Sequence, residues 1–247
     1  MEPSPATPQR PWLRLVLAVS LDGRLAPAAG GAAQIGGPGD RRVLEESLAW
    51  ADACLIGAET LRRHGTTCLI RDADLLRQRQ GRTPQPLAIA VSRGRSLPGD
   101  LRFFQQPLRR WLLTLAASGG IDAPGAAAGV SRQLDCGQAE SSPSGFECHL
   151  HGRDWTEALT ALATAGLERV VVLGGATLAG SLVAEGLLDE LQLSLCPVLL
   201  GGPHGWLPAA VVPGQQPWRW QLGEQRLLES GELLLRYRRA DAEEARH

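Results

Sequence analysis

Two adjacent glycines, Gly174 and Gly175, lie between an apolar run and a stretch with helical character. The run, residues 170–173, has no polar alternation, which is typical of a strand covered on both faces of a parallel sheet. The glycines allow close backbone approach, and the free N–H groups of a helix beginning near Ala176 favour an anion such as a pyrophosphate. A glycine pair between strand and helix is as often a plain tight turn, so both interpretations stay open.

Three other polar turns also follow short apolar runs that predict strands: residues 20–23, 57–60 and 92–95. The first contains Ser20 and Asp22, and the last carries a hydroxyl and two guanidinium groups. In open α/β sheets, ligands bind at the carboxyl ends of the strands. These turns are therefore candidates for the same ligand-binding edge as the glycine pair.

The elements that position these turns follow from hydrophobic periodicity and from capping signals. Strands are predicted at residues 13–19, 53–56, 87–91, 111–115, 169–173 and 190–198. Helices are predicted at residues 38–51, from the 57–60 turn onward, at 154–166 and at 175–186, and a hairpin at 218–228 and 232–239. The alternation predicts an α/β fold with a mostly parallel sheet, helices on both faces, and an antiparallel C-terminal hairpin.

The remaining segments are predicted to be irregular. Residues 65–71 are expected to be extended, residues 72–85 to form a surface excursion, and residues 117–148 to be loops around one short strand near Val130. Residues 1–11 contain four prolines and predict a disordered tail, and residues 240–247 a mobile charged tail. A single domain is expected between them, from residue 12 to residue 239.

Composition narrows the class of partner. The chain has 247 residues, 44% of them hydrophobic, and a net charge of −1 without a basic stripe. A nucleic-acid surface is therefore not indicated. No run approaches the roughly 20 apolar residues of a membrane span, so no membrane partner is expected. We expect a cytoplasmic protein that binds a small molecule.

Five cysteines, an odd number without C-x-x-C spacing, argue against a disulfide framework and a structural zinc site. They are expected to be reduced thiols, and no metal is expected. The sequence also lacks G-x-G-x-x-G, G-x-x-x-x-G-K-[ST] and G-x-S-x-G. These absences argue against a standard Rossmann dehydrogenase, a P-loop enzyme and an α/β-hydrolase.

Taken together, the motifs resemble the reductase domain of riboflavin biosynthesis, a pyrimidine reductase that forms the C-terminal half of a bifunctional deaminase-reductase. The motifs are residues 18–24, 57–60, 92–93, 174–180, 186–191 and 196–202, in the family's order across residues 12–239. The resemblance implies a dihydrofolate reductase-like fold, with three layers (α/β/α).

The resemblance also implies NADPH as the cofactor. The implied cofactor-binding residues are Ala18, Gly57, Thr60, Ser92, Arg93, Gly174, Gly175, Ala176, Thr177 and Leu178. A hydroxyl and a guanidinium at residues 92 and 93 suit the 2′-phosphate dianion that distinguishes NADPH from NADH. Without the family, Thr60 is equally explained as a helix-cap hydroxyl and Arg93 as an exposed turn charge.

The implied reaction reduces the ribosyl group of 5-amino-6-(5-phosphoribosylamino)uracil, or of the related diaminopyrimidinone, to a ribityl chain. Ser20 and Arg71 are implied to bind this phosphorylated pyrimidine, and Asp22 and His64 to act in catalysis. Asp22 is also consistent with a purely local turn, and His64 with a solvated helix end. The family resemblance also leads us to expect a homodimer.

Four positions depart from the family pattern. His64 replaces the first acid of an Asp-Asp-Pro motif, Leu48 a substrate-binding arginine, Leu173 an acid before the glycine pair, and Gln34 a tryptophan. Three of these changes remove charged groups from the substrate side. Two other functions therefore stay open: a reductase of another pteridine-like or small carbonyl substrate, and a non-catalytic nucleotide-binding member.

Overall fold

The computed structural model describes residues 10–31, 34–93, 97–116, 145–211 and 218–240. One nine-stranded sheet runs through them, in the order β5-β4-β3-β2-β6-β1-β7-β9-β8. Its strands are β1 (Trp12–Ser20), β2 (Ala53–Gly57), β3 (Leu87–Ser92), β4 (Arg110–Leu115), β5 (Cys148–Gly152), β6 (Arg169–Val172), β7 (Glu190–Cys196), β8 (Trp220–Leu227) and β9 (Leu233–Arg239). Strands β1 to β7 pair in parallel, and only β9 pairs antiparallel, with β7 and with β8.

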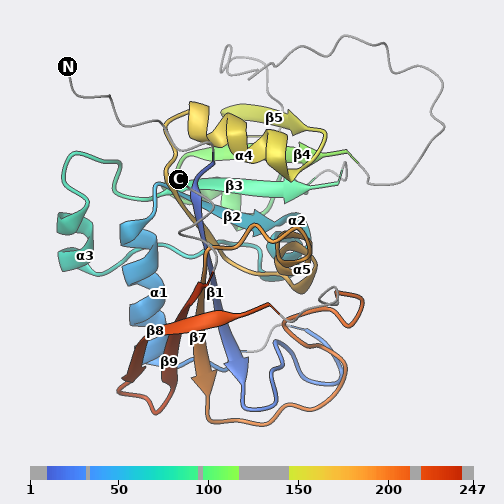
Figure 1. Ribbon diagram of the computed structural model, residues 1–247. Helices are drawn as coiled ribbons and strands as arrows, with labels where there is room; N and C mark the ends of the chain where they lie inside the picture. The colour runs from blue at the N-terminus through green and yellow to red at the C-terminus, as the bar shows by residue number, and fades with distance from the viewer. Residues whose placement is uncertain (1–9, 32–33, 94–96, 117–144, 212–217, 241–247) are drawn as a thin grey trace, which may run out of the picture.

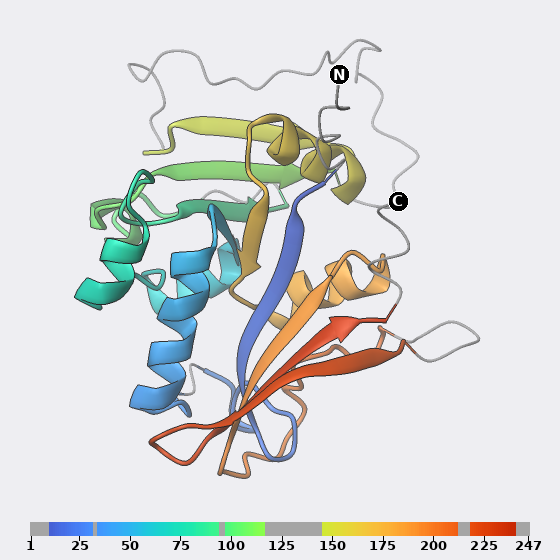
Figure 2. The ribbon, with the colours of Figure 1, turned by 60° about the vertical axis from the view of Figure 1, so that its left-hand side comes forward.

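Helices cover both faces of this sheet (Figure 1). The helices are α1 (Pro38–Trp50), α2 (Ala58–His64), α3 (Ala73–Gln78), α4 (Trp155–Thr164) and α5 (Ala176–Ala184), with a short 3₁₀ helix η1 (Arg102–Gln105). The apolar residues of α4 and α5 pack on one face, and those of α1, α2 and α3 pack on the other. The three-layer α/β/α prediction is therefore confirmed, as is the antiparallel hairpin, whose long twisted strands are visible in Figure 2.

Burial on both faces explains the apolar runs seen in the sequence. In β6, Val170 and Val172 face one core and Val171 faces the other, and all three are fully buried. In β2, Leu55 and Cys54 divide between the two faces in the same way. A strand that buries both faces has no polar side, so its sequence shows no alternation.

One prediction for the irregular segments is wrong, and one strand was not predicted. Residues 148–152 form β5, an outer strand of the sheet, and only residue 148 of it falls in the predicted loop region. Residues 72–85 contain α3 and the buried Arg79 rather than only surface loop. Residues 65–71 join no strand of the sheet. Two glutamine side chains form hydrogen bonds with their backbone instead: Gln106 bonds the N–H and C=O of Thr67, and Gln85 bonds those of Ile70.

The chain ends and the cysteines need smaller corrections. Arg10 forms two hydrogen bonds to the Asp189 carboxylate, of 2.8 and 2.9 Å, so the described fold begins before residue 12. Residues 1–9, the strand expected near Val130 and residues 241–247 lie outside the described residues. The expectation of five reduced thiols is wrong for Cys148, which is disulfide-bonded, because an odd count excludes only complete pairing. Three other thiols are free: Cys54, Cys68 and Cys196.

None of the helices within the described ranges has the length and apolarity needed to cross a lipid bilayer.

A buried arginine holds the end of α1 beside the sheet. The Arg79 side chain is 2% exposed, and its Nη1 donates to the carbonyls of Leu48, Ala49 and Ala51 at 3.0, 3.1 and 2.6 Å. These carbonyls lie at the C-terminal end of the helix, where the regular intrahelical bonding runs out; Leu48 also accepts the Ala51 amide at 3.3 Å, and Ala49 also accepts from Arg82 at 2.8 Å. Burial lowers the Arg79 pKa to about 10, which leaves the guanidinium charged at neutral pH. Its charge also complements the negative end of the helix dipole.

Arg79→Ala is expected to lower the free energy of unfolding by about 2–3 kcal/mol, because buried carbonyls lose a charged donor. Arg79→Lys should recover part of this loss, since one ammonium can reach some of the same oxygens. Arg77→Ala, at an exposed position of α3 two residues before Arg79, is the control and should change stability by less than about 0.5 kcal/mol. Urea unfolding of the three variants measures these differences, and equal stability of R79A and R77A would contradict the capping role.

Candidate functional site

The four predicted turns follow the carboxyl ends of four neighbouring strands. Strands β3, β2, β6 and β1 are adjacent in that order, and all run in parallel. Val172, the last residue of β6, pairs with Leu55 of β2 on one side and with Leu15 of β1 on the other. The glycine pair therefore emerges between the ends of β2 and β1, at the carboxyl edge where the sequence placed the four turns.

The β2 and β6 turns touch each other. Gly174 and Gly175 have φ angles of 81° and 93°, which favour glycine. A Cβ atom on Gly175 would lie 2.8 Å from the Thr60 hydroxyl oxygen, and one on Gly57 would lie 3.6 Å from the same oxygen. Gly174 is equally constrained, because its Cβ would lie 2.7 Å from the Leu17 side chain. This packing holds the start of α5 against the first turn of α2.

A cavity of about 420 Å³ opens beside these turns, and we name it the Arg93 cavity. Five predicted cofactor-binding residues line it: Gly57, Ser92, Arg93, Thr177 and Leu178. Trp155 closes one side and donates from its indole nitrogen to the Ser181 hydroxyl at 3.2 Å. Arg93 is exposed and forms no ion pair with any described residue. The cavity thus joins an apolar, aromatic wall to a hydroxyl and an available guanidinium, and its lining also contains three carboxylates, those of Glu59, Asp154 and Glu185.

A second cavity, of about 600 Å³, is lined by other residues of α2, Thr60 and His64, and we name it the Arg71 cavity. Arg71 and Leu173 line it from neighbouring segments. Its described lining contains three arginines and one histidine but no aspartate or glutamate. Its volume is that of a typical small-molecule site, and its charge favours an anion.

Ser20 and Asp22 have a different setting. Neither lines the Arg93 or the Arg71 cavity. The Ser20 hydroxyl donates to Asp22 Oδ1 at 2.6 Å, and the Asp22 carboxylate accepts the Leu200 and Gly201 amides at 3.1 and 2.8 Å. The bond from Ser20, together with these amides, lowers the Asp22 pKa to about 2. Asp22 is therefore ionised at neutral pH and clamps the turn after β1 to the loop after β7.

The sequence of this chain matches one known protein family over most of its length. Residues 11–226 match the model of the RibD C-terminal domain. The chain belongs to that family. The resemblance drawn from the short motifs is therefore confirmed.

Named relatives agree with this assignment. The chain is 27% identical, over 78% of its length, to a 2,5-diamino-6-ribosylamino-4(3H)-pyrimidinone 5′-phosphate reductase from Archaeoglobus fulgidus, of which it covers 83%. It is 28% identical, over 77% of its length, to the riboflavin biosynthesis protein RibD from Escherichia coli, of which it covers 49%. It therefore spans most of the first relative and about half of the second.

Solved structures give the fold. RibD from Acinetobacter baumannii superposes with a TM-score of 0.70 at 22% identity, over 94% of this chain and 58% of that one. A dihydrofolate reductase from Enterococcus faecalis, complexed with NADP(H), superposes with a TM-score of 0.50 at 14% identity, over 93% of this chain and 97% of that one. These similarities support the predicted dihydrofolate reductase-like fold.

The four positions that depart from the RibD pattern lie in different environments: a cavity, the core and the surface. His64 and Leu173 both line the Arg71 cavity, so two of the changed residues face the same space. Leu48, in the last turn of α1, is fully buried in the core against the sheet and lines neither named cavity. Gln34 is exposed and also lines neither. The departures therefore alter the Arg71 cavity and leave the predicted lining of the Arg93 cavity in place.

The remaining predicted cofactor residues lie near the cavities without lining them. Gly174, Gly175 and Ala176 form the β6–α5 turn, and Ala18 is half-buried in β1, next to Leu17. Residues that the sequence analysis missed include Trp155 and Ser181 at the Arg93 cavity, and Arg41 and Arg102 at the Arg71 cavity. No local pattern marks them, because each reaches its cavity through long-range packing.

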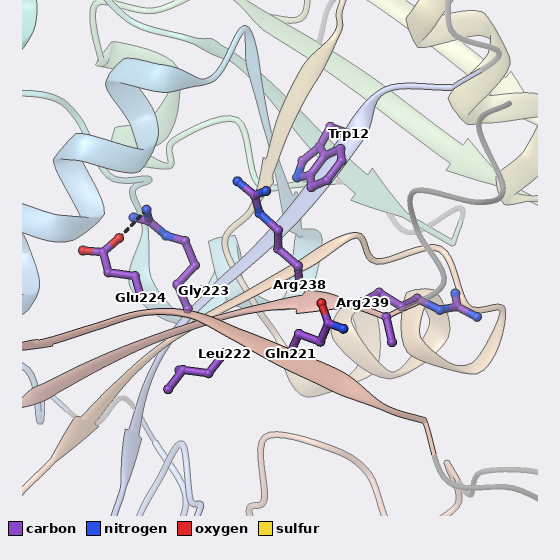
Figure 3. Close-up of a pocket in the computed structure, with 9 residues that line it drawn as sticks. Trp12, Gln221, Leu222, Gly223, Glu224, Arg238 and Arg239 are labelled. Carbon is purple, nitrogen blue, oxygen red and sulfur yellow. Dashed lines mark ion pairs between the residues drawn. The ribbon is translucent and has the colours of Figure 1, made fainter.

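A third cavity, of about 470 Å³, lies between Trp12 and the C-terminal hairpin (Figure 3). Trp12, at the start of β1, lines it together with Gln221, Glu224, Arg236 and Arg238 of the hairpin. Glu224 and Arg236 form an ion pair of 2.6 Å in it. None of the predicted site residues contributes to its lining. In the ranges that the structure describes, no group of three or more His, Cys, Asp or Glu side chains is arranged to hold a metal ion.

Asp22→Asn is expected to loosen the clamp between the two loops, since an amide cannot accept all three hydrogen bonds as a carboxylate does. The Leu200 and Gly201 amides should then exchange their hydrogens faster. Because the folded-state pKa is lowered to about 2, the clamp contributes stability above the unfolded value of about 3.9 and loses it as the pH falls toward 2. Hydrogen exchange and urea unfolding between pH 3 and 7 measure both effects. Asp74→Asn, an exposed carboxylate on α3, is the control, and identical exchange in D22N and wild type would contradict the clamp.

Proposed function

We propose that this chain is an NADPH-dependent reductase of riboflavin biosynthesis that reduces the ribosyl group of a phosphorylated aminopyrimidine to a ribityl chain. One observation carries the proposal: turns from β3, β2 and β6, far apart in the sequence, meet at one sheet edge between the Arg93 and Arg71 cavities. Membership of the RibD C-terminal domain family and the names of the relatives support it.

The residues of the Arg93 cavity fit a phosphorylated dinucleotide. The β6–α5 turn presents backbone at positions where a Cβ would collide, and the start of α5 offers free amides to a diphosphate. Ser92 and Arg93 suit the 2′-phosphate of NADPH. Trp155 and Leu178 supply an apolar wall for the adenine. When bound, the dihydronicotinamide supplies the hydride for the reduction.

The residues of the Arg71 cavity fit the other reactant. Thr60 lines this cavity and also touches the β6–α5 turn, so it stands where cofactor and substrate meet. Arg71 binds the substrate's phosphate, and His64, whose imidazole can donate or accept a proton, faces the same space. Ser20 and Asp22 act from outside the cavity: Asp22 is a positioning residue that fixes the loop after β7 rather than a group that touches substrate.

A second candidate keeps the cofactor and changes the substrate to another pteridine-like or small carbonyl compound. The observation in its favour is that Leu173 and His64 replace two acids in the lining of the Arg71 cavity. In the pyrimidine substrate, a ring N–H that would donate a hydrogen bond to one of those acids has no charged acceptor here. An unsatisfied donor of this kind lowers the binding free energy by about 1–3 kcal/mol. A non-catalytic nucleotide-binding member is the third candidate.

Turnover distinguishes these candidates. The purified chain should oxidise NADPH, followed by its near-ultraviolet absorbance, when 5-amino-6-(5-phosphoribosylamino)uracil or its diaminopyrimidinone counterpart is added, and NADH should be a poorer reductant. NADPH binding without turnover of either compound would favour another substrate. Absence of NADPH binding by calorimetry would contradict the reductase proposal altogether.

Gly175→Ala provides the site-specific arm of this experiment. A methyl group there meets the Thr60 oxygen at 2.8 Å and should weaken NADPH binding at least tenfold. Gly166→Ala is the matched control, because Gly166 has a similar φ of 79° but nothing within 4 Å of its added Cβ. Both variants carry the backbone strain of a positive φ, and only G175A should lose the cofactor. Equal NADPH affinities would remove the β6–α5 turn from the proposed site.

The proposed enzyme is a homodimer that pairs through its hairpin. Strand β8 is the last strand of the sheet and exposes an unpaired edge, with Leu222 50% and Leu227 76% exposed. Light scattering after size exclusion should give the mass of two chains, and Leu227→Lys should reduce it to one. Leu199→Lys, at a 75% exposed leucine outside β8, should leave the dimer intact. A wild-type monomer would contradict this assembly.

A further inference from the structure

The 3₁₀ helix η1 is fixed against the rim of the Arg71 cavity. Phe103 is fully buried and packs on Phe104 and Phe146, with ring centroids 5.3 and 6.3 Å away. Its amide donates to the carbonyl of Gly65, the residue after α2, at 2.7 Å. On the far side of η1, the Gln106 amide group bonds both the N–H and the C=O of Thr67 at 2.8 Å. These contacts place η1 beside His64 and the segment that leads to Arg71.

Arg102, the first residue of η1, is exposed and lines the cavity, and its guanidinium has no acidic partner among the described residues. Arg71 has the same property, and its own backbone is held by a 2.7 Å hydrogen bond from its amide to Glu45. Arg41, in contrast, is already occupied: its guanidinium bonds Glu45 at 2.6 Å and the Leu69 carbonyl at 2.8 Å. Two guanidinium groups without acidic partners among the described residues therefore face the cavity.

The nearest carboxylate does not neutralise them. Glu45 is 5% exposed, and its two oxygens are taken by Arg41 and by the amides of Arg71 and Asp72. No other acid is among the described residues that line the cavity. Two like charges on one cavity, without a counterion from its described lining, favour a ligand that brings two negative charges of its own. A phosphate monoester is such a ligand, and guanidinium groups bind it through paired hydrogen bonds.

We infer that Arg102 binds the phosphate monoester of the substrate, and that with Arg71 it forms a two-arginine clamp in the Arg71 cavity. This inference rests on the proposed function, whose substrate carries a ribose 5-phosphate. The clamp also compensates for the arginine that the family pattern places at position 48. Leu48 lies in the core of this protein, and η1 supplies the second cation from a different part of the chain. Arg102 thereby makes the site specific for the phosphorylated form of the substrate.

Ribose 5-phosphate is the probe, because it carries the phosphate without the pyrimidine. Calorimetry should show that it binds the wild-type chain, that Arg102→Ala weakens binding at least tenfold, and that Arg102→Lys is intermediate because an ammonium lacks the bidentate fork. Arg77→Ala, an exposed arginine on α3 outside the cavity, is the matched control and should bind as wild type does. NADPH affinity should be the same in all four proteins, which separates the clamp from the cofactor site and reports an intact fold.

Kinetics with the aminouracil substrate provide the second arm. Arg102→Ala should raise KM at least tenfold for the phosphorylated compound, and it should leave the already poor turnover of the dephosphorylated compound unchanged. If R102A weakens the binding of ribose 5-phosphate and R77A does not, the clamp is supported. This holds even if the chain reduces neither pyrimidine, in which case only the proposed function fails. Wild-type turnover together with unchanged KM and binding in R102A overturns the clamp and leaves the function standing. Failure of the wild-type chain to bind ribose 5-phosphate overturns it as well.

Discussion

The parallel pairing of β6 with β2 on one side and β1 on the other is the constraint on which the rest of the site depends. Val170, Val171 and Val172 are fully buried, and β6 is only four residues long. It ends while β2 and β1 continue, so the chain that follows it must turn in the gap between them. That turn requires the positive φ angles of Gly174 and Gly175, and it places them against Thr60. The proposed cofactor position is thus a consequence of strand lengths.

Helix α2 then divides the space at the strand ends into two cavities of different chemistry. Ala58, Glu59 and Arg62 line the Arg93 cavity, and Thr60 and His64 line the Arg71 cavity. Because these two sets interleave along one seven-residue helix, the two cavities lie close together, each beside a different set of its side chains. Thr60 belongs to both neighbourhoods, because it lines one cavity and touches the glycine turn that borders the other. Such an arrangement suits a reaction between two bound molecules, which must be held in contact.

The sequence predicted the strands and helices that local residue patterns determine, and it missed the features that depend on contacts between distant parts of the chain. The buried strands and the α4 cap were predictable, because apolar runs and the Asp154 cap, which accepts the Glu157 amide at 2.8 Å, are local signals. Strand β5 was missed because an outer strand with exposed His151 lacks an apolar run. The clamp at Asp22 joins residues 179 positions apart, and no spacing in the sequence indicates it. Arg102 is likewise an ordinary exposed arginine until η1 is docked beside α2.

The proposed substrate cavity differs from the RibD pattern in the sign of its charge, and the changes act in the same direction. Leu173 and His64 remove two acids from the lining of the Arg71 cavity, while Arg71 and Arg102 have no carboxylate partners in its described lining. If the acids were present, they would pair with these arginines across a cavity of about 600 Å³ and reduce its attraction for an anion. In the proposed reductase, their replacement would therefore shift recognition from the pyrimidine ring toward the phosphate. The glycine turn, which depends on strand lengths and not on charge, is unaffected by that shift.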